Sequence, residues 1–400
     1  MNNTSCLRTQ YDSCLLPIYA PPQPVLVRGQ GSRVWDENDK EYVDFGGGIA
    51  VLSLGHAPPI LTAAISEQAG RLLHTSNLHV NDAAVHLAQK LVEETFAARS
   101  FLCNSGAEAN EAAIKLARHH GCSIQSEKYH VLAFENSFHG RVGMAMAATG
   151  QQKIRNGFGP LTPGMRFAPF NDLAATAAMM DDDVCGIIVE PVQGEGGVVP
   201  AANGFLAGLR DLADRHKALL IFDEIQSGAG RTGHLYNYME THVTPDVLTT
   251  AKGLGGGFPV AAMLVSEAAA AGFPVGAHGS TYGGNPLAAR AALAVLGEIL
   301  KDDFLEGVKK RENLFCDKLE ELNNEFNCFS DIRHKGCLIG IDMAEGWTVK
   351  TVVATALDEG LIVITAGQNT LRLAPALNIS VEDIDAGFAR LRRALQILRI

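Results

Sequence analysis

The sequence lacks the short motifs that identify several large enzyme classes. It contains no HExxH zinc motif, no GxSxG nucleophile elbow and no GxxxxGK(S/T) phosphate loop. Its eight cysteines are scattered, with neither a CxxC pair nor the Cys/His spacing of a zinc finger. The sequence therefore lacks the motifs that usually support an interpretation as a metal hydrolase, a serine hydrolase or a nucleoside triphosphatase. We predict no metal site, and free thiols in a reducing compartment.

Segments suited to secretion or membrane insertion are also missing. Residues 1–14 have no basic region leading into an apolar run, so no secretory signal is visible. The longest uncharged stretch, 268–289, contains several glycines, two prolines and a histidine, which a membrane helix would disfavour. We therefore predict a cytoplasmic protein with no membrane partner.

Basic residues are fewer than acidic ones, 33 against 44, for a formal net charge of -11. An acidic chain is a poor general partner for nucleic acid or an anionic membrane surface. Apolar residues make up 47% of the chain, which is typical of globular proteins and rules out wholesale disorder. Glycine is in surplus, with 41 residues against a usual share of about 7%.

Short apolar runs rich in β-branched residues alternate with longer amphipathic segments. This alternation predicts an α/β fold with a mostly parallel sheet and crossover helices on both faces. Polar residues gather at the ends of several runs, where open α/β sheets bind ligands. The predicted strands cover residues 99–103, 130–134, 185–190, 218–222, 246–250 and 260–265, and the clearest helices cover 107–120 and 204–216.

The last part of the chain has a different pattern. Residues 285–324 indicate one or two long helices, and short strands follow near 337–343 and 370–374. We predict an N-terminal arm (1–45) that contributes to a small domain, a large domain (46–284) and a C-terminal small α+β domain (285–400).

One candidate for anion binding follows the predicted strand 99–103. Ser105 and Glu108 fit a capping box, which places a helix N-terminus here. The N–H groups of such a terminus, with Gly106 allowing close approach, can bind a phosphate. Taken alone, these residues are better explained by ordinary helix capping, because capping boxes are common.

Two charged residues each end an apolar strand. Asp223 can keep a cationic ring nitrogen protonated, and a metal ligand or a helix cap are the alternatives for it. Lys252 precedes a turn with four glycines in five residues. Burial of this lysine would depress its pKa and favour the neutral amine that attacks a carbonyl. A lysine that extends to solvent beside a flexible loop is the alternative.

Residues 228–233 spell GxGxxG, the fingerprint of dinucleotide-binding folds. In that fingerprint the glycines turn directly off a strand into a helix, and an acidic residue ends the next strand. Here five residues separate Phe222 from Gly228, and Asp246 begins the next strand instead of ending it. We therefore do not interpret this segment as a nicotinamide or flavin site.

The remaining candidates lie in loops. Phe138 can stack on a planar group, and Arg141 can bind a carboxylate with two hydrogen bonds. Glu195 and Arg372 also fit a site that handles carboxylates, and the loop 279–285 offers hydroxyls between glycines. A phosphate site, an acid for a ring nitrogen, a stacking ring and a lysine able to bond an aldehyde together describe a site for pyridoxal phosphate.

With these residues in place, the sequence resembles the class III (ornithine-type) aminotransferases, which have the fold of aspartate aminotransferase. The block 221–226 (IFDEIQ), followed by Pro245-Asp246 and by 251–253 (AKG), is highly specific to that class. The resemblance extends over nearly the whole chain. Within the class, the chain is similar to the acetylornithine and succinylornithine aminotransferases, on the segments 35–36, 45–50, 105–110 and 190–198.

The resemblance implies which residues bind the cofactor. Lys252 would bond the cofactor covalently and later move a proton, and Asp223 would contact the pyridine nitrogen. The other implied contacts are Gln226 on the ring hydroxyl, Phe138 on the ring face, Ser105, Gly106 and Ala107 on the phosphate, and Thr281 and Ser280 from the second subunit of a homodimer.

The resemblance also implies how two substrates are bound. Arg141 would take a substrate carboxylate, and Arg372 the α-carboxylate of glutamate. Glu195 would neutralise Arg372 while the ornithine derivative is bound, and Tyr19 would line the substrate entrance. An ion pair of Arg372 and Glu195 that opens for one substrate and closes for the other would let one site accept a terminal amine and an α-amine in turn.

The predicted activity is transfer of the terminal amino group of N2-acylated ornithine, acetylated or succinylated, to 2-oxoglutarate, in arginine metabolism. Alternatives are a transaminase for ornithine, 4-aminobutyrate or succinyldiaminopimelate, and a catalytically silent regulator that binds pyridoxal phosphate. The chain departs from the family at Pro58, where a second histidine is usual, and this departure concerns the packing of that loop and not the chemistry. The acyl pocket has no readable motif, so the preferred acyl group is left open.

Overall fold

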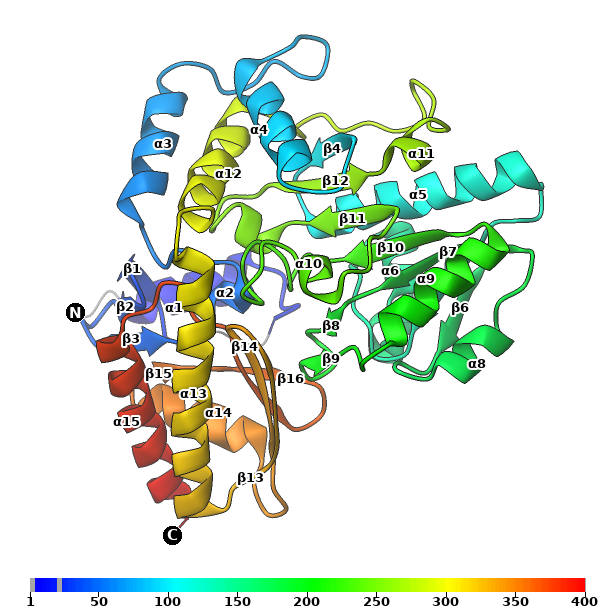
Figure 1. Cartoon of the computed structure of the whole chain (residues 1–400). Helices are drawn as coiled ribbons and strands as arrows, with labels where there is room; N and C mark the ends of the chain where they lie inside the picture. The colour runs from blue at the N-terminus through cyan, green and yellow to red at the C-terminus, as the bar shows by residue number, and fades with distance from the viewer. Residues whose placement is uncertain (1–3, 20–23, 400) are drawn as a thin grey trace.

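The largest element of the fold is a seven-stranded sheet (Figure 1). The computed structural model describes residues 4–19 and 24–399. Four of the six neighbouring strand pairs are parallel, and only β12 runs against both of its neighbours. In spatial order the strands are β4 (Arg99–Cys103), β12 (Ala261–Val265), β11 (Val247–Thr250), β10 (Leu219–Asp223), β7 (Val184–Val189), β5 (His130–Phe134) and β6 (Met165–Ala168).

The predicted mostly parallel sheet is confirmed. Two predicted strands have the observed bounds, and the other four differ by one residue at one or both ends. β6 was not predicted. Its four residues include Met165 and Arg166, so it lacks the uniform apolar run of the central strands.

Helices cover both faces of this sheet (Figure 1). On one face, α5 (Gly106–Ile124) packs its alanines and Leu116 against side chains such as Ile188. On the other face, α9 (Phe205–His216) packs Leu209 and Leu212 beside the neighbouring Ile187. Consecutive strand residues point to opposite faces. Because both faces are covered, the central strands are apolar at nearly every position.

A second core holds the two ends of the chain together. It lies between two four-stranded sheets and the long helices α13 (Phe304–Phe326), α14 (Val349–Asp358) and α15 (Val381–Leu398). One sheet has the order β1 (Leu26–Gln30), β2 (Arg33–Asp36), β3 (Glu41–Asp44), β15 (Leu361–Ile362). The other has the order β13 (Phe329–Lys335), β14 (Leu338–Met343), β17 (Thr370–Leu373), β16 (Ile364–Ala366).

The predicted three-part division stays a prediction, and two packing details refine it. β3 pairs in parallel with β15, so residues 41–44 join the C-terminal part. The helix α12 (Pro286–Ile299) instead packs on α3 (Pro59–Ala69) and α4 (Asp82–Glu93), within the core of the large sheet. This packing favours a division after Ile299 rather than at residue 285.

The glycine-rich loop 228–233 connects the two cores. Arg231 is fully buried, and its guanidinium donates to the carbonyl oxygens of Cys337, at 3.0 Å, and Pro375. Gly230 has a φ of +86°, and a Cβ there would lie 3.0 Å from Leu377. The loop therefore uses its glycines for close packing between chain segments, and not for a dinucleotide.

The remaining elements are short and surround the large sheet or the N-terminus. They are α1 (Thr4–Cys14), α2 (Gly47–Ala50), α6 (Gly143–Ala148), α7 (Gln152–Arg155), α8 (Leu173–Ala178), β8 (Val192–Gln193), β9 (Val199–Pro200), α10 (Tyr238–Thr241), the 3-10 turn η1 (Lys252–Leu254) and α11 (Glu267–Ala270). Within residues 4–19 and 24–399, no helix is both long and apolar enough to cross a membrane. The cysteines with described side chains are all free thiols.

Candidate active site

A cavity of about 400 Å³ lies at the carboxyl ends of β10 and β11, beside the start of α5. This is the position at which open α/β sheets bind their ligands. Eight of the residues predicted to bind cofactor or substrate line the cavity: Ser105, Gly106, Ala107, Phe138, Arg141, Asp223, Gln226 and Lys252. The fold therefore brings together side chains that are up to 147 positions apart, from 105 to 252.

The N-terminus of α5 forms one wall of the cavity. The Ser105 hydroxyl accepts a hydrogen bond from the Glu108 N–H, at 3.3 Å. The Glu108 carboxylate accepts in turn from the N–H of Asn104, at 2.6 Å, one residue earlier than in an ideal capping box. The N–H groups of Gly106 and Ala107 belong to the first turn and have no acceptor within the helix. They are free to bind an anion.

Gly106 is required here by close packing. A Cβ at this position would lie 2.6 Å from the Ile225 side chain. Any larger residue would push the helix start away from the loop that follows β10, and so away from Asp223. Gly106 therefore keeps the anion-binding end of α5 close to the acidic end of β10.

Asp223 is buried and held by three donors. Its Oδ2 atom accepts from His139 Nδ1 at 2.7 Å and from Asn110 Nδ2 at 2.8 Å. Its Oδ1 atom accepts from the Ile225 N–H at 3.1 Å. Asn110 is fixed in turn because its Oδ1 accepts from the Thr249 hydroxyl at 2.8 Å. These bonds orient a carboxylate that faces the cavity and satisfy much of its need for donors in a buried setting.

The sequence interpretation did not find His139. Burial disfavours the protonated imidazole, but the hydrogen bond and charge of Asp223 outweigh it and raise the pKa of His139. Its neighbour in the motif, Phe138, donates its N–H to Glu190 at 2.9 Å, and burial raises the pKa of Glu190 to about 7. The one sequence signal was the position of His139 between the two candidates Phe138 and Arg141.

Lys252 is partly buried at the opposite side of the cavity, where it begins the turn η1 with a φ of +41°. Burial lowers the pKa of its amine to about 8. The charges of Glu195 and Arg372 act on this pKa in opposite directions. At pH 7 about one tenth of such amines are neutral, against fewer than about one in a thousand at the ordinary pKa of about 10.4.

This shift predicts how the amine reacts with pH. In the protein without cofactor, acetic anhydride should label Lys252 with a midpoint near pH 8, because only the neutral amine is a nucleophile. Peptide mass spectrometry measures the labelled fraction, and a short lysine peptide in the same tube is the control. A Lys252 midpoint that matches the peptide would contradict the assigned burial effect.

Arg372 and Glu195 form an ion pair beside the cavity. Arg372 Nη1 lies 2.6 Å from Glu195 Oε1 and 3.0 Å from Gln226 Oε1. Arg372 is 2% exposed, and its Nε has no hydrogen-bond partner among the described residues. Burial alone would raise the pKa of Glu195, but the charge and hydrogen bond of Arg372 lower it below the usual value. The two predicted residues therefore meet, although 177 positions separate them.

Three predicted residues lie away from the cavity. Ser280 and Thr281 are not among its lining residues, and the Ser280 hydroxyl accepts from Asn104 Nδ2 at 3.2 Å. Tyr19 is 72% exposed and also lies outside the lining. The contribution of Ser280 and Thr281 from a second subunit, and of Tyr19 to the entrance, stay predictions.

The residues present fit pyridoxal phosphate. The free N–H groups at the start of α5 suit its phosphate, and the oriented Asp223 carboxylate suits its ring nitrogen. A partly buried lysine with a lowered pKa suits its aldehyde. Phe138 lines the same cavity and offers an aromatic surface for the ring.

Comparison with known proteins agrees with this fit. A family model described as Aminotransferase class-III matches residues 18–395. The acetylornithine/succinyldiaminopimelate aminotransferase of Yersinia pestis is 50% identical over 391 residues, which are 97% of this chain and 96% of that protein.

Two solved structures share the fold. The N-acetylornithine aminotransferase from Stenotrophomonas maltophilia is 41% identical, with a TM-score of 0.83 and coverage of 95% of this chain and 97% of that one. An ornithine aminotransferase from Toxoplasma gondii is 30% identical, with a TM-score of 0.94 and coverage of 100% and 96%, and holds pyridoxal phosphate at partial occupancy. The chain therefore belongs to the class III aminotransferases, the pyridoxal-phosphate-dependent family that its motifs predicted.

Proposed function

We propose that this aminotransferase moves the terminal amino group of an N2-acylated ornithine to 2-oxoglutarate. The products are the N-acylated glutamate semialdehyde and glutamate. The observation that carries the proposal is the ion pair between the buried Arg372 and the partly buried Glu195, with Arg141 on the wall of the neighbouring cavity. Two arginines, of which one is neutralised by a carboxylate, suit two substrates with different carboxylate positions.

Each half-reaction uses the pair in a different state. With the acylornithine, Arg372 stays paired to Glu195, and Arg141 takes the substrate carboxylate. The terminal amine then reaches Lys252. With glutamate, Glu195 moves aside and Arg372 takes the α-carboxylate, so that the α-amine reaches the same place. Glu195 keeps its charge at neutral pH because the pKa of its carboxyl is lowered, so the closed pair is stable without substrate.

Lys252 is the proposed acid and base of the reaction. When bound, pyridoxal phosphate supplies a ring that draws electrons from the substrate carbon that loses its proton. Asp223 holds the ring nitrogen in its protonated form through opposing charge, and His139 and Asn110 hold Asp223 in place. The Lys252 amine, with its pKa near 8, is suited both to take and to return a proton at neutral pH.

We further propose a homodimer, in the cytoplasm, with the site at the subunit interface. Asn77 donates to the carbonyl oxygens of Ser280, at 2.9 Å, and Gly283, at 3.1 Å, which places two loops together. These loops expose Leu78 (86%) and Tyr282 (65%). Exposed apolar side chains on adjacent loops favour a protein interface, and light scattering of the purified protein would test it.

A substrate series tests the proposed activity. With 2-oxoglutarate as acceptor, kcat/KM should be at least about tenfold higher for N2-acetyl- or N2-succinylornithine than for ornithine or 4-aminobutyrate. The reason is that 4-aminobutyrate lacks the substituted α-carbon, and ornithine lacks the acyl group. Highest efficiency with either of these two would contradict the proposal. Absence of turnover with every amine would favour a silent regulator.

The proposed substrates place the enzyme in arginine metabolism. An N2-acyl group prevents the semialdehyde from cyclising onto its own α-amine, so the acyl group is a chemical requirement of a linear product. The reaction that supplies the substrate must therefore be an acylation of this α-amine, or a step on an already acylated precursor. The chemistry is the same whether the enzyme acts in the synthesis or in the breakdown of arginine.

A further inference from the structure

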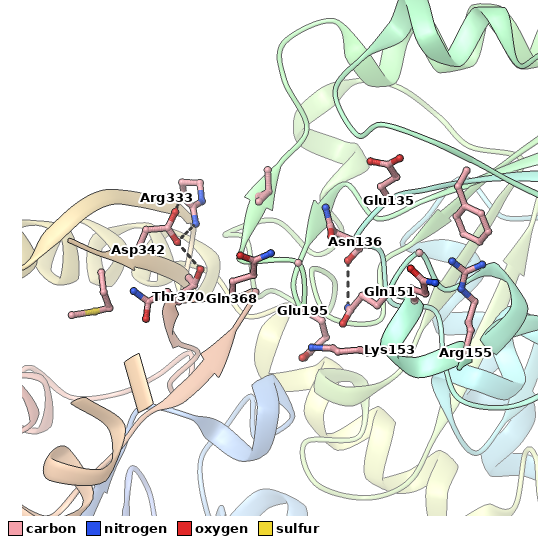
Figure 2. A pocket seen from close by; sticks show the side chains of 18 of the residues that line it. Glu135, Asn136, Gln151, Lys153, Arg155, Glu195, Arg333, Asp342, Gln368 and Thr370 are labelled. Atoms are coloured by element: carbon pink, nitrogen blue, oxygen red, sulfur yellow. Dashed lines mark hydrogen bonds and ion pairs between the residues drawn. The ribbon is translucent and has the colours of Figure 1, made fainter. Parts of the chain in front are cut away.

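A second, larger cavity of about 1020 Å³ begins at Glu195. It lies between the loops that follow β5 and α6 on one side and the β13–β14 and β16–β17 segments on the other. Figure 2 shows Gln151 and Lys153 entering from the first side, Gln368 and Thr370 from the second, and Glu195 between them in this view. Because Glu195 also pairs with Arg372, this cavity adjoins the substrate end of the active site.

Some charged side chains of this cavity have an ion-pair partner, and others have none among the described residues. Glu195 is paired with Arg372, and Asp342 with Arg333 at 2.7 Å, so these four groups offer little net charge to a ligand. Lys153 and Arg155 take part in none of the ion pairs found among the described residues.

Arg155 and Lys153 are nevertheless held differently. The Arg155 guanidinium carbon lies 4.3 Å from the centre of the Phe167 ring, a cation–π contact that fixes its position. Its Nε atom is buried without a hydrogen-bond partner. Lys153 is exposed and reaches into the cavity, and its amine forms no ion pair with another described residue. Among the residues that the structure describes, Glu135 is the acid of the lining without an ion-pair partner, so two such cations face one such anion.

Neutral hydrogen-bonding groups complete the lining. Gln151 donates weakly to the Asn136 carbonyl oxygen, at 3.4 Å, and Gln368 is exposed on the opposite side. Asn369 is already used, because its amide bridges Trp347 and Val349. The cavity is thus a polar space with positive charge on one wall, suited to an anionic arm that carries amide groups of its own.

We propose that this cavity binds the acyl arm of the substrate, and that Lys153 receives a carboxylate at the far end of that arm. The proposal rests on the proposed function, and it deepens it by naming the substrate class: N2-acyl diamino acids whose acyl group ends in a carboxylate, such as succinyl. An acetyl arm ends in a methyl group and leaves Lys153 without a partner. Arg155 is a positioning residue that adds positive charge to the same wall.

The test compares two acyl groups on one enzyme and its variants. In the holoenzyme, the ratio of kcat/KM for N2-succinylornithine to that for N2-acetylornithine should fall about tenfold in Lys153→Gln. Lys153→Arg should retain most of the ratio, because the cation remains. Lys310→Gln, at an exposed lysine on α13 outside the cavity, should leave the ratio unchanged. An unchanged ratio in Lys153→Gln would overturn the proposal.

A binding measurement separates this proposal from the proposed function. N-succinyl-norvaline and N-acetyl-norvaline keep the carbon chain but lack the reacting amine, so calorimetry reports their binding without turnover. The succinyl compound should bind the holoenzyme more tightly, with an advantage that Lys153→Gln removes and high salt reduces. Equal loss of both ligands in Lys153→Gln would overturn the acyl-arm assignment. Failure of the unaltered enzyme to turn over either acylornithine would instead overturn the proposed function.

Discussion

Lys252→Ala should lower kcat for the acylornithine and 2-oxoglutarate pair by at least about 10⁴-fold. The substitution removes the one lysine among the described residues of the cavity lining, and with it both the covalent bond to the cofactor and the acid and base of the proton transfer. Steady-state kinetics measures the loss. Reduction with borohydride, followed by peptide mass spectrometry, should find cofactor on the Lys252 peptide of the unaltered protein and on no lysine peptide of the variant.

Two controls make this result specific. Lys252→Arg should lose as much activity as the alanine variant, because a guanidinium stays protonated and is a poor nucleophile. Added methylamine should restore part of the activity of Lys252→Ala, because it replaces a missing base and does not repair a misfolded site. Retention of more than about one hundredth of kcat in Lys252→Ala would exclude this lysine as the base.

Asp223→Asn should lower kcat/KM by about 10²- to 10³-fold, the usual cost of losing one oriented electrostatic group in a buried site. The amide carries no charge to keep a ring nitrogen protonated. The NH₂ group of the asparagine would also face a hydrogen-bond donor, whichever of the two carboxylate oxygens it replaces. One oxygen of Asp223 accepts from His139 and Asn110, and the other accepts from the Ile225 N–H, so an NH₂ group has no acceptor there.

The matched control is Asp246→Asn. Asp246 lies just before β11, at the end of that strand away from the cavity. Asp246 accepts from Arg210 and from the Leu220 N–H, both at 2.8 Å, and does not line the cavity. This variant should lose thermal stability but keep kcat within about twofold. Cofactor affinity, measured by fluorescence titration, should fall in Asp223→Asn alone. Equal kinetic losses in the two variants would show that Asp223 acts only through stability.

Individual residues show how far the sequence interpretation reached. Asp223 and Lys252 were recognisable because each ends an apolar run, and the ends of parallel strands meet at one edge of a sheet. His139 was not recognisable, because its importance comes from one contact with Asp223, 84 positions away. The same is true of Asn110, which lies on a helix face that its sequence pattern leaves indistinguishable from the core.

Packing also adds detail to the interpretation of some segments. α12 follows the predicted boundary at residue 285 but packs with the large sheet, because its alanine-rich surface allows close approach to α3 and α4. The glycines of the loop 228–233 let the segment around the buried Arg231 pack against the C-terminal part of the chain.

By itself, the sequence determined the α/β class, the family, the cofactor and the two residues at the centre of the proposed chemistry. These follow from local patterns, since hydrophobic periodicity, strand ends and short motifs are properties of neighbouring residues. Only the tertiary structure decided which distant charges lie in contact. It placed Arg372 2.6 Å from Glu195, a pair that only the family resemblance had implied, and left Lys153 without an ion pair among the described residues of the adjoining cavity. The physical reason is that Coulomb interactions depend on distance in space, and a single sequence records only distance along the chain.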